Sequence, residues 1–270
     1  MWEQVRNWVK SQPNIHRAAL WLLRMFGVFA GLRDIAALWR YPFFVRDWLR
    51  FRRLGGRAAV LDFYPCLHDR TATTGVDSHY FHQAIWGFKR IQSNLPESHV
   101  DVGSDVRWVG MLTCVTRVCF IDIRPLSIQL DNYESKEGSI VALPFPDRSL
   151  SSVSSLHVIE HIGLGRYGDP IDPEGSAKAG AELMRVLAPG GRLYISMPIG
   201  NARVQFNGQR VFSVADVLAL FPGLGLVELS IVDTLGKFHA SVSPEAIRLG
   251  QGQGLDYGLG MFIFSGPNKI

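Results

Sequence analysis

Short β-rich runs alternate with helical patterns along the chain from residue 98 onward. The β-rich runs occupy 98–102, 118–121, 152–156 and 192–197, and a helical pattern of apolar residues covers 177–187. Parallel strands need long crossovers, which are usually helices, so this alternation is typical of α/β folds. The pattern therefore predicts a doubly wound, mostly parallel α/β sheet.

Further elements are expected on both sides of these runs. Apolar residues recur at helical spacing over 78–93, which predicts a helix before the first strand. A second helix is expected over 213–221, with Ser213 as its N-cap. The runs at 226–232 and 259–265 predict two final strands, which we expect to pair as an antiparallel hairpin.

The first quarter of the chain has a different pattern. Residues 1–54 are rich in Trp, Leu and Arg at helical spacing, interrupted by Pro42, and Gly55-Gly56 marks a boundary. We therefore expect an N-terminal helical extension over 1–57. The α/β domain would follow over 58–270, beginning with a short strand and a polar loop that covers the sheet.

Composition narrows the class of protein. Apolar residues make up 47% of the 270, enough for a sizeable core. The formal net charge is +4, and arginines before Leu61 supply much of the positive charge, so no nucleic-acid partner is expected. Three cysteines without a CxxC pair disfavour a zinc site or redox dithiol and fit a reducing cytoplasm.

No segment is long and apolar enough to predict a transmembrane helix. The most apolar stretch, 18–32, contains Arg24 and is shorter than the ~20 residues that span a bilayer. The start of the chain also lacks the basic region of a signal peptide. An amphipathic helix within 1–54 would either touch a membrane surface or pack on the main domain or a second subunit. The protein is thus expected to be cytoplasmic, with peripheral membrane contact as an alternative and the oligomeric state open.

The ends of the first two predicted strands carry candidate cofactor ligands. Gly103 follows the first strand, and Asp122 ends the second. A glycine lets the backbone approach a ligand closely, and an acid at a strand tip accepts hydrogen bonds from a ribose diol. Gly103 and Gly110 do not fit the GxGxxG pattern of nicotinamide-binding sites. The alternatives are a plain turn at Gly103 and a solvated or Arg124-paired carboxylate at Asp122.

A cluster of polar residues follows the strand at 152–156. His157, Glu160 and His161 lie at the sheet edge where ligands bind in such folds, and histidine is suited to general-base chemistry. The HxxEH spacing also resembles a zinc motif. Its first histidine ends a strand, however, and no third ligand is evident, so no metal is expected. The structural alternative is that Glu160 and His161 cap a helix and bond to loop backbone.

The next loop, 163–170, is punctuated by glycines and is suited to covering a substrate. Arg166 can clamp a carboxylate or phosphate in bidentate fashion, or instead pair with Asp169 or Asp172. Further candidates for substrate contact, or alternatively solvated loop residues, come from three loops: His68, Arg70, Tyr167, Asn207 and Arg210.

Several of these motifs follow the order found in class I S-adenosylmethionine-dependent methyltransferases. They are Asp101-x-Gly103, Asp122, Leu143-Pro-Phe145, the strand ending at His157, Glu160-His161 and Leu187-Ala-Pro-Gly-Gly191. Within that superfamily, Leu156–Pro170 resembles the signature of domain of unknown function 268, with a match over about residues 60–265.

The resemblance implies a seven-stranded Rossmann-like sheet and S-adenosylmethionine as cofactor. The residues that it places at the cofactor are Asp101, Gly103, Asp122, Ser139, Ile140 and Leu143. Two departures stand out. Asp105 and Arg107 replace the later glycines of the first motif, and Ser139 stands where the superfamily often has Asp.

We therefore predict a methyltransferase that acts on a small polar or sugar-like acceptor. His157, Glu160 and His161 would be the catalytic residues. The alternative is a non-catalytic binding or scaffold protein that keeps the methyltransferase fold. The residues predicted to bind substrate are His68, Arg70, Arg166, Tyr167, Asn207 and Arg210.

Overall fold

The computed structural model describes residues 38–60, 63–248 and 255–267. The chain divides into two compact units, residues 1–75 and 76–270. The predicted boundary after residue 57 falls inside the first unit, and the helices predicted within residues 1–37 lie outside the described residues. Among the described residues, no helix combines the length and the apolar character needed to cross a membrane.

The first unit contains a short 3-10 helix, η1 (Leu38–Arg40), and the helix α4 (Tyr41–Arg53). Pro42, expected as a break, lies in the first turn of α4, where its missing N–H costs no intrahelical hydrogen bond. Phe63 packs edge-on against Phe44 and Trp48, with ring centroids 5.0 Å apart in each pair. The described residues between 57 and 63 form no strand, so the short strand expected there is not seen in them.

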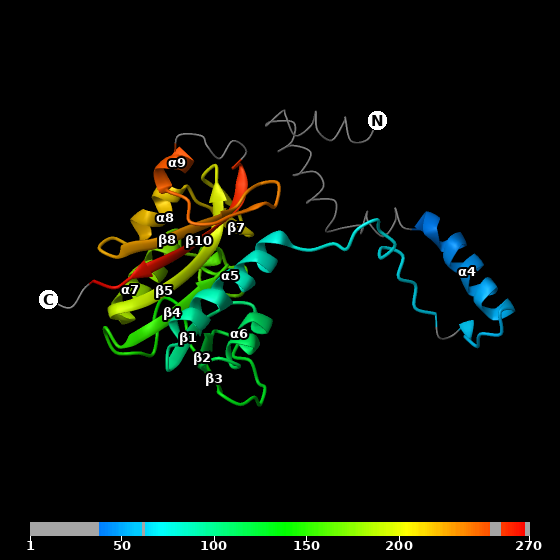
Figure 1. The fold of residues 1–270 in the computed structure, drawn as a ribbon, viewed down its shortest axis with the longest axis horizontal. Helices are drawn as coiled ribbons and strands as arrows, with labels where there is room; N and C mark the ends of the chain where they lie inside the picture. The colour runs from blue at the N-terminus through cyan, green and yellow to red at the C-terminus, as the bar shows by residue number, and fades with distance from the viewer. Residues whose placement is uncertain (1–37, 61–62, 249–254, 268–270) are drawn as a thin grey trace. The chain divides into compact units, whose positions relative to one another are not determined.

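The second unit is an α/β domain whose strands and helices alternate through most of its length (Figure 1). Its elements are, in chain order, α5 (Ser78–Asn94), β1 (Ser98–Val102), α6 (Val106–Leu112), β2 (Arg117–Asp122), β3 (Tyr133–Glu137), β4 (Leu150–Leu156), the 3-10 helix η3 (Ile159–His161), α7 (Gly175–Val186), β5 (Leu187–Gly200), β6 (Arg203–Gln205), β7 (Gln209–Val211), α8 (Val214–Leu220), β8 (Gly225–Val232), β9 (Phe238–His239), α9 (Pro244–Arg248) and β10 (Tyr257–Ser265).

Eight of these strands form one sheet in the order β3-β2-β1-β4-β5-β10-β8-β9. The first five of that order are parallel, and β10 runs antiparallel between β5 and β8. The predicted antiparallel pairing of the last two strands is therefore confirmed. Strands β6 and β7 pair separately as a hairpin. This is a Rossmann-like, mixed but mostly parallel sheet, as predicted. It has one strand more than the expected seven, because the two-residue β9 pairs with β8 at the edge.

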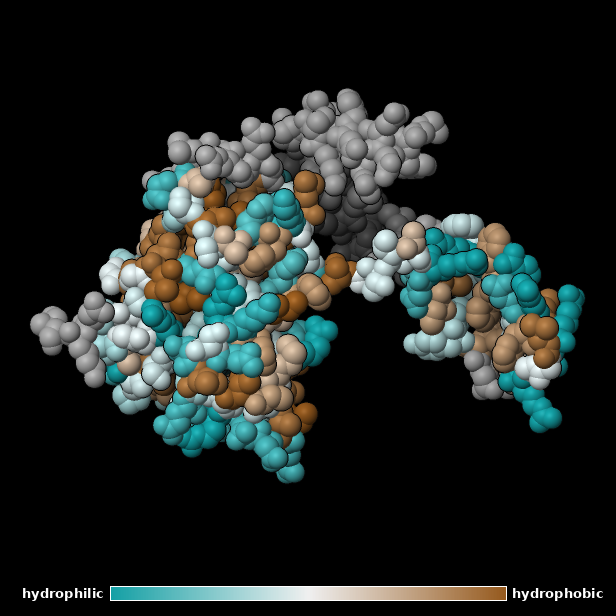
Figure 2. Space-filling view, in the orientation of Figure 1, coloured by the Kyte–Doolittle hydropathy of each residue, from teal (hydrophilic) through white to brown (hydrophobic). Residues whose placement is uncertain are grey.

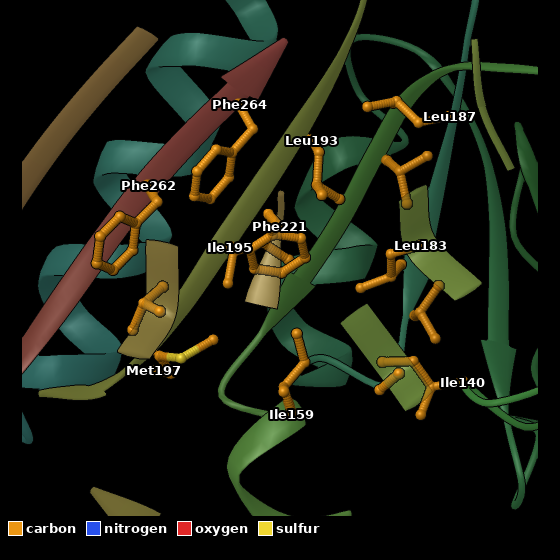
Figure 3. Close-up of a cluster of buried hydrophobic side chains, with 14 of the residues drawn as sticks. Ile140, Ile159, Leu183, Leu187, Leu193, Ile195, Met197, Phe221, Phe262 and Phe264 are labelled. Carbon is orange, nitrogen blue, oxygen red and sulfur yellow. The ribbon is translucent and has the colours of Figure 1, made fainter. Parts of the chain in front are cut away.

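Helices cover both faces of the sheet, and alternate residues of each central strand face opposite layers. In β5, Leu193, Ile195 and Met197 join a buried cluster with residues of α7 and α8 (Figure 3). Tyr194 faces the other way, into a cluster with Trp86 of α5 and residues of α6. Burial on both faces fits the mostly apolar strand β10, whereas β1 and β4 also bury polar residues such as His99 and Ser154.

The hydrophobic pattern missed β3, besides the short elements β6, β7, β9 and α9. The sequence of β3, Tyr-Glu-Ser-Lys-Glu, carries charged residues at three of five positions, and none of them is buried. An edge strand has a neighbour on one side only and here buries little side-chain surface. Its pairing with β2, from Val118 opposite Tyr133 to Asp122 opposite Glu137, holds it in the sheet.

Candidate active site

A pocket with a cavity volume of about 310 Å³ lies where β1, β2 and β4 end. Strands β2 and β3, which follow β1 along the chain, lie on one side of it, and β5, which follows β4, lies on the other side of β4. The connections that leave β1 and β4 therefore separate and leave a crevice between them. The pocket walls include Gly103 and Asp122 on one side and His157 and His161 on the other. Candidate cofactor ligands and candidate catalytic residues therefore share one pocket.

The turn after β1 approaches the end of β4 closely. Gly103 has φ +73°, a left-handed conformation that favours glycine. A Cβ atom built on it would lie 3.0 Å from Cγ1 of Val158. The turn thus leaves the pocket wall open at a position where any side chain would be crowded.

Asp101 lies beneath this turn and does not line the pocket. Its carboxylate accepts hydrogen bonds from the backbone N–H and hydroxyl of Ser104, the Trp108 indole and the Ser154 hydroxyl. Burial raises the pKa of Asp101 to about 6, although these donors favour the charged form. Asp101 therefore holds the turn in place from behind. The resemblance implied that it would contact the cofactor, but it does not reach the pocket.

Asp105, which replaces a glycine of the superfamily motif, is the N-cap of α6. Its carboxylate accepts a hydrogen bond from the backbone N–H of Arg107 at 2.9 Å and pairs with that residue's guanidinium at 2.8 Å. Asp105 also lines the pocket. The departure from the glycine pattern thus adds a cap that glycine lacks, while Gly103 alone makes the close turn.

Asp122 lines the pocket at the end of β2, with 17% of its side chain exposed. Oδ1 accepts the backbone N–H of Arg124 at 2.7 Å, and the nearest guanidinium nitrogen of Arg124 lies 4.0 Å away. Carboxylate lone pairs stay available to a ligand in the pocket. The predicted Arg124 alternative is thus present only as a long contact.

The segment after β3 forms the next part of the wall. Ser139 and Ile140 line the pocket. Leu143 instead belongs to the buried core, and its backbone N–H donates to Glu182 at 2.6 Å. Ser139 and Ile140 are therefore placed to touch a ligand, whereas Leu143 supports the turn from behind.

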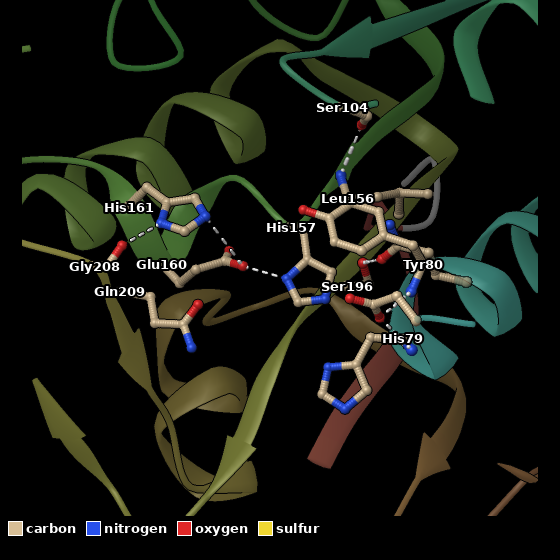
Figure 4. A network of polar contacts seen from close by, with 12 residues as sticks. His79, Tyr80, Ser104, Leu156, His157, Glu160, His161, Ser196, Gly208 and Gln209 are labelled. Atoms are coloured by element: carbon tan, nitrogen blue, oxygen red, sulfur yellow. Dashed lines mark hydrogen bonds and ion pairs between the residues drawn. The ribbon is translucent and has the colours of Figure 1, made fainter. Parts of the chain in front are cut away.

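His157, Glu160 and His161 lie side by side, with Glu160 between the two imidazoles (Figure 4). Nδ1 of His157 lies 2.5 Å from Oε1 of Glu160. A carboxylate only accepts hydrogen bonds when ionised, so this nitrogen carries the proton. His157 also has φ +58°, a conformation that costs a non-glycine residue on the order of 1–3 kcal/mol and clusters at functional sites.

His161 is the imidazole with a lone pair available near the glutamate. Its Nδ1 lies 2.7 Å from the carbonyl oxygen of Gly208, which only accepts, and 3.3 Å from Nη1 of Arg166, which only donates. The shorter contact assigns the proton to Nδ1 and leaves Nε2 free to take one. Nε2 lies 3.8 Å from Oε1 of Glu160. Burial lowers the pKa of His161, which keeps the ring neutral near pH 7 despite the opposing effect of Glu160.

The first turn of α5 packs against His157. The ring of Tyr80 stacks on His157 with centroids 5.1 Å apart, and His79 stacks at 5.8 Å. Tyr80 also lines the pocket. Nε2 of His157 is buried and has no hydrogen-bond partner among the described residues. The stacked rings cover His157, and the side chains of His157 and His161 are about equally buried.

The loop predicted to cover the pocket contributes Tyr167 to the wall. The guanidinium carbons of Arg124 and Arg166 lie 4.7 Å and 5.0 Å from the centroid of its ring. Asp169 accepts the backbone N–H groups of Gly163 and Tyr167. The predicted ion pair of Arg166 with Asp169 or Asp172 is not formed in the part of the chain that the structure describes.

The remaining predicted substrate residues do not line this pocket. Arg210 is 8% exposed and donates to the carbonyl oxygens of Ile162 and Pro173, so it fastens the covering loop. Asn207 is exposed in the β6–β7 turn. His68 and Arg70 belong to the first unit, and their predicted contact with substrate stays a prediction. Within the described ranges, no group of three or more His, Cys, Asp or Glu residues is arranged to hold a metal ion.

Comparison with known families agrees with the resemblance of the Leu156–Pro170 segment. The model of the family described as "Caenorhabditis protein of unknown function, DUF268" matches residues 98–235, about half of the chain. The chain belongs to this family. No curated protein matches it.

Solved structures with a similar fold include three proteins of low sequence identity. The (4+2)-cyclase SpnF is 13% identical over 80% of this chain and 90% of its own, with a TM-score of 0.50. The N-methyltransferase NodS from Bradyrhizobium japonicum WM9, solved with S-adenosylhomocysteine, is 16% identical over 71% and 88%, with a TM-score of 0.49. YcgJ from Bacillus subtilis is 12% identical over 70% and 100%, also with 0.49. These likenesses concern the fold of this DUF268 member and leave its reaction open.

Proposed function

We propose that this DUF268 protein binds S-adenosylmethionine and transfers its methyl group to a small polar acceptor. One observation carries the proposal: Gly103 and Asp122 share a pocket with His157 and His161, and the buried Glu160 lies against both imidazoles. S-adenosylmethionine is a nucleoside with a ribose diol, which suits the strand-tip carboxylate of Asp122. The open turn at Gly103 leaves room for such a ligand against the backbone.

In this proposal, Asp122 accepts hydrogen bonds from the ribose hydroxyls, while Ser139 and Ile140 border the adenine ring of the cofactor. The bound cofactor would supply an electrophilic methyl group on a sulfonium. His161 takes the proton from an acceptor O–H at Nε2. Glu160 then lies beside the imidazolium, and the hydrogen bond from His157 fixes the position of that carboxylate. His157 is thus a positioning residue rather than the base.

Binding is the first test. Calorimetry with S-adenosylmethionine and S-adenosylhomocysteine on the full chain should give saturable binding of both. If neither ligand binds, the alternative of a scaffold protein that keeps only the fold is favoured. Binding without turnover on any acceptor would support a binding protein instead.

Replacing His161 by Ala should separate binding from turnover. We expect S-adenosylhomocysteine affinity to stay within about twofold, because Nε2 faces the acceptor side. Turnover should fall by about 10²–10⁴, the usual contribution of a general base. The measurement is the formation of S-adenosylhomocysteine from S-adenosylmethionine with a panel of sugars and polyols. The matched control is His82→Ala, a histidine of α5 outside the pocket. Unchanged turnover in His161→Ala would rule out His161 as the base.

We also propose that α4 contacts anionic lipid at a membrane surface. The helix carries four arginines and one acid, and none of its residues is buried. Phe43 and Phe51 are about half exposed, and Figure 2 shows hydrophobic and hydrophilic side chains mixed along the helix. Exposed aromatic rings beside arginines suit the boundary between headgroups and acyl chains.

Vesicle flotation tests this contact. The full chain should float with vesicles that contain phosphatidylserine, and less so with phosphatidylcholine alone or at high salt. The double variant Leu49→Ser, Phe51→Ser should lose most of this binding. Leu235→Ser, which changes an exposed leucine of the second unit, should keep it. Equal flotation of all three proteins would contradict a role for α4.

A further inference from the structure

Two arginines meet on one aromatic ring at the edge of the pocket. Arg124 follows β2, and Arg166 lies in the loop after η3, 42 residues further along the chain. Both guanidinium carbons lie within 5.0 Å of the centroid of Tyr167. A cation over an aromatic face is attracted to it without losing its N–H groups to a carboxylate. Each guanidinium therefore keeps its charge within 5.0 Å of the centre of the same ring.

Among the described residues, no carboxylate accepts a hydrogen bond from either guanidinium, and Arg124 forms only a long ion pair with Asp122. The carboxylates near the pocket edge have other partners: Asp105 pairs with Arg107, Asp172 with Lys178, and Asp169 with backbone N–H groups. Asp122 lies 4.0 Å from Arg124, too far for a hydrogen bond. Nη1 of Arg166 donates to the carbonyl oxygen of Gly208 at 3.2 Å and lies 3.3 Å from Nδ1 of His161. The other N–H groups of the two guanidiniums have no oxygen partner within the described ranges.

The cluster is also next to the reaction residues. Tyr167 and Arg124 line the pocket, and 65% of the Arg124 side chain is exposed, so its head group faces solvent at the rim. The ring of His161 meets Tyr167 edge-on, with centroids 5.6 Å apart. A group bound by the arginines would thus lie close to the candidate base, because Nη1 of Arg166 is 3.3 Å from Nδ1 of His161.

We propose that the acceptor carries an anionic group, a phosphate or a carboxylate, that Arg124 and Arg166 bind at this rim. The inference rests on the proposed methyl transfer and names the acceptor class. Guanidinium N–H groups match the oxygens of both anions in a fork-like geometry. The acceptor is then an anionic small molecule whose hydroxyl reaches His161 while its charge stays at the rim.

The test follows the Arg Nε–H signals of the ¹⁵N-labelled full chain by NMR during titration with inorganic phosphate and, separately, acetate. We expect the Arg124 and Arg166 signals to shift saturably with at least one anion. In Arg124→Gln, the remaining Arg166 signal should titrate at about tenfold higher anion concentration, as expected for loss of one charged hydrogen bond. Arg117→Gln is the control, because Arg117 is exposed at the opposite end of β2 and paired with Glu97.

Shifts that do not saturate, or that match those of Arg117 in size, would overturn the inference. So would competition between the anion and S-adenosylhomocysteine in calorimetry, because the arginines would then serve the carboxylate of the cofactor. Saturable shifts without such competition support an acceptor site. If the anion binds and S-adenosylhomocysteine does not, the proposed methyl transfer fails while the anion site stands. If S-adenosylhomocysteine binds and the anion does not, only the proposed anion site fails.

Discussion

Replacing Asp122 by Ala should weaken the binding of S-adenosylhomocysteine by about 100-fold or more. The carboxylate lies in the pocket at the end of β2, and a ribose diol can donate two hydrogen bonds to it. Hydrogen bonds to a charged group contribute about 1.5–3 kcal/mol each, and about 1.4 kcal/mol corresponds to a tenfold change in Kd. Isothermal titration calorimetry on the full chain measures the effect.

Two further variants make this experiment specific. Asp122→Asn keeps the size of the side chain but removes its charge, and we expect an intermediate loss of about tenfold or more. Asp131→Ala removes an exposed acid outside the pocket and should bind like the wild type. Unchanged affinity in Asp122→Ala, in a protein that unfolds at the wild-type temperature, would sink the role given to Asp122.

Replacing either member of a buried pair should change the pH dependence of stability in opposite directions. His99 and Asp101 are both fully buried in β1, and the Ser154 hydroxyl lies between them. Burial lowers the pKa of His99 to about 3 from an ordinary 6.5. It raises the pKa of Asp101 to about 6 from an ordinary 3.8.

These two shifts act against each other. Asp101 has the higher pKa when folded, so its contribution to stability is complete below pH 3.8 and is lost as pH rises through about 6. His99 has the lower pKa when folded, so its contribution is complete above pH 6.5 and is lost as pH falls toward about 3. Between these limits, folding moves a proton within the pair. The wild type should thus show little net slope from it.

Urea unfolding between about pH 4.5 and 6 measures the effect. As the pH rises from about 4.5 to 6, the unfolding free energy of Asp101→Asn should increase by about 2 kcal/mol relative to the wild type, because only the contribution of His99 then changes with pH. The unfolding free energy of His99→Gln should decrease by about as much over the same rise in pH. Both variants should be less stable than the wild type overall, since each leaves buried hydrogen-bonding groups without a suitable partner.

The control for this experiment is Asp131→Asn, which changes an exposed acid and should run parallel to the wild type. The comparison uses differences from the wild type, so other titrating groups cancel. If both buried variants run parallel to the wild type, the pair does not exchange a proton on folding. Slopes of the same sign in both variants would contradict the opposed pKa shifts.

The hydrophobic pattern determined most of the second unit. The predicted strand over 98–102 coincides with β1, and the predicted helix over 78–93 differs from α5 by one residue at its end. Ser213 caps α8 as expected, with Asp216 completing a capping box. These features depend on residues that are neighbours in the sequence, and local spacing and capping are what a sequence pattern records.

Part of the candidate site was also visible in the sequence. His157, Glu160 and His161 lie within five residues at a strand end, so their proximity follows from short-range geometry. Gly103 and Asp122 end neighbouring parallel strands, which brings them to one edge of the sheet. The order of these motifs was enough to indicate the fold, and the Leu156–Pro170 segment was enough to indicate the family.

Only the tertiary structure decided which side chains face the pocket. Asp101 and Arg210 are polar residues in the expected segments, yet both are buried and hold turns in place. Tyr80 reaches the pocket from a helix that precedes the sheet, and Arg124 meets Tyr167 across 43 residues of sequence. Such contacts depend on how distant elements pack and on which way a side chain turns at a strand end. The sequence determined where the polar groups are, and packing determined which of them are free to bind a ligand.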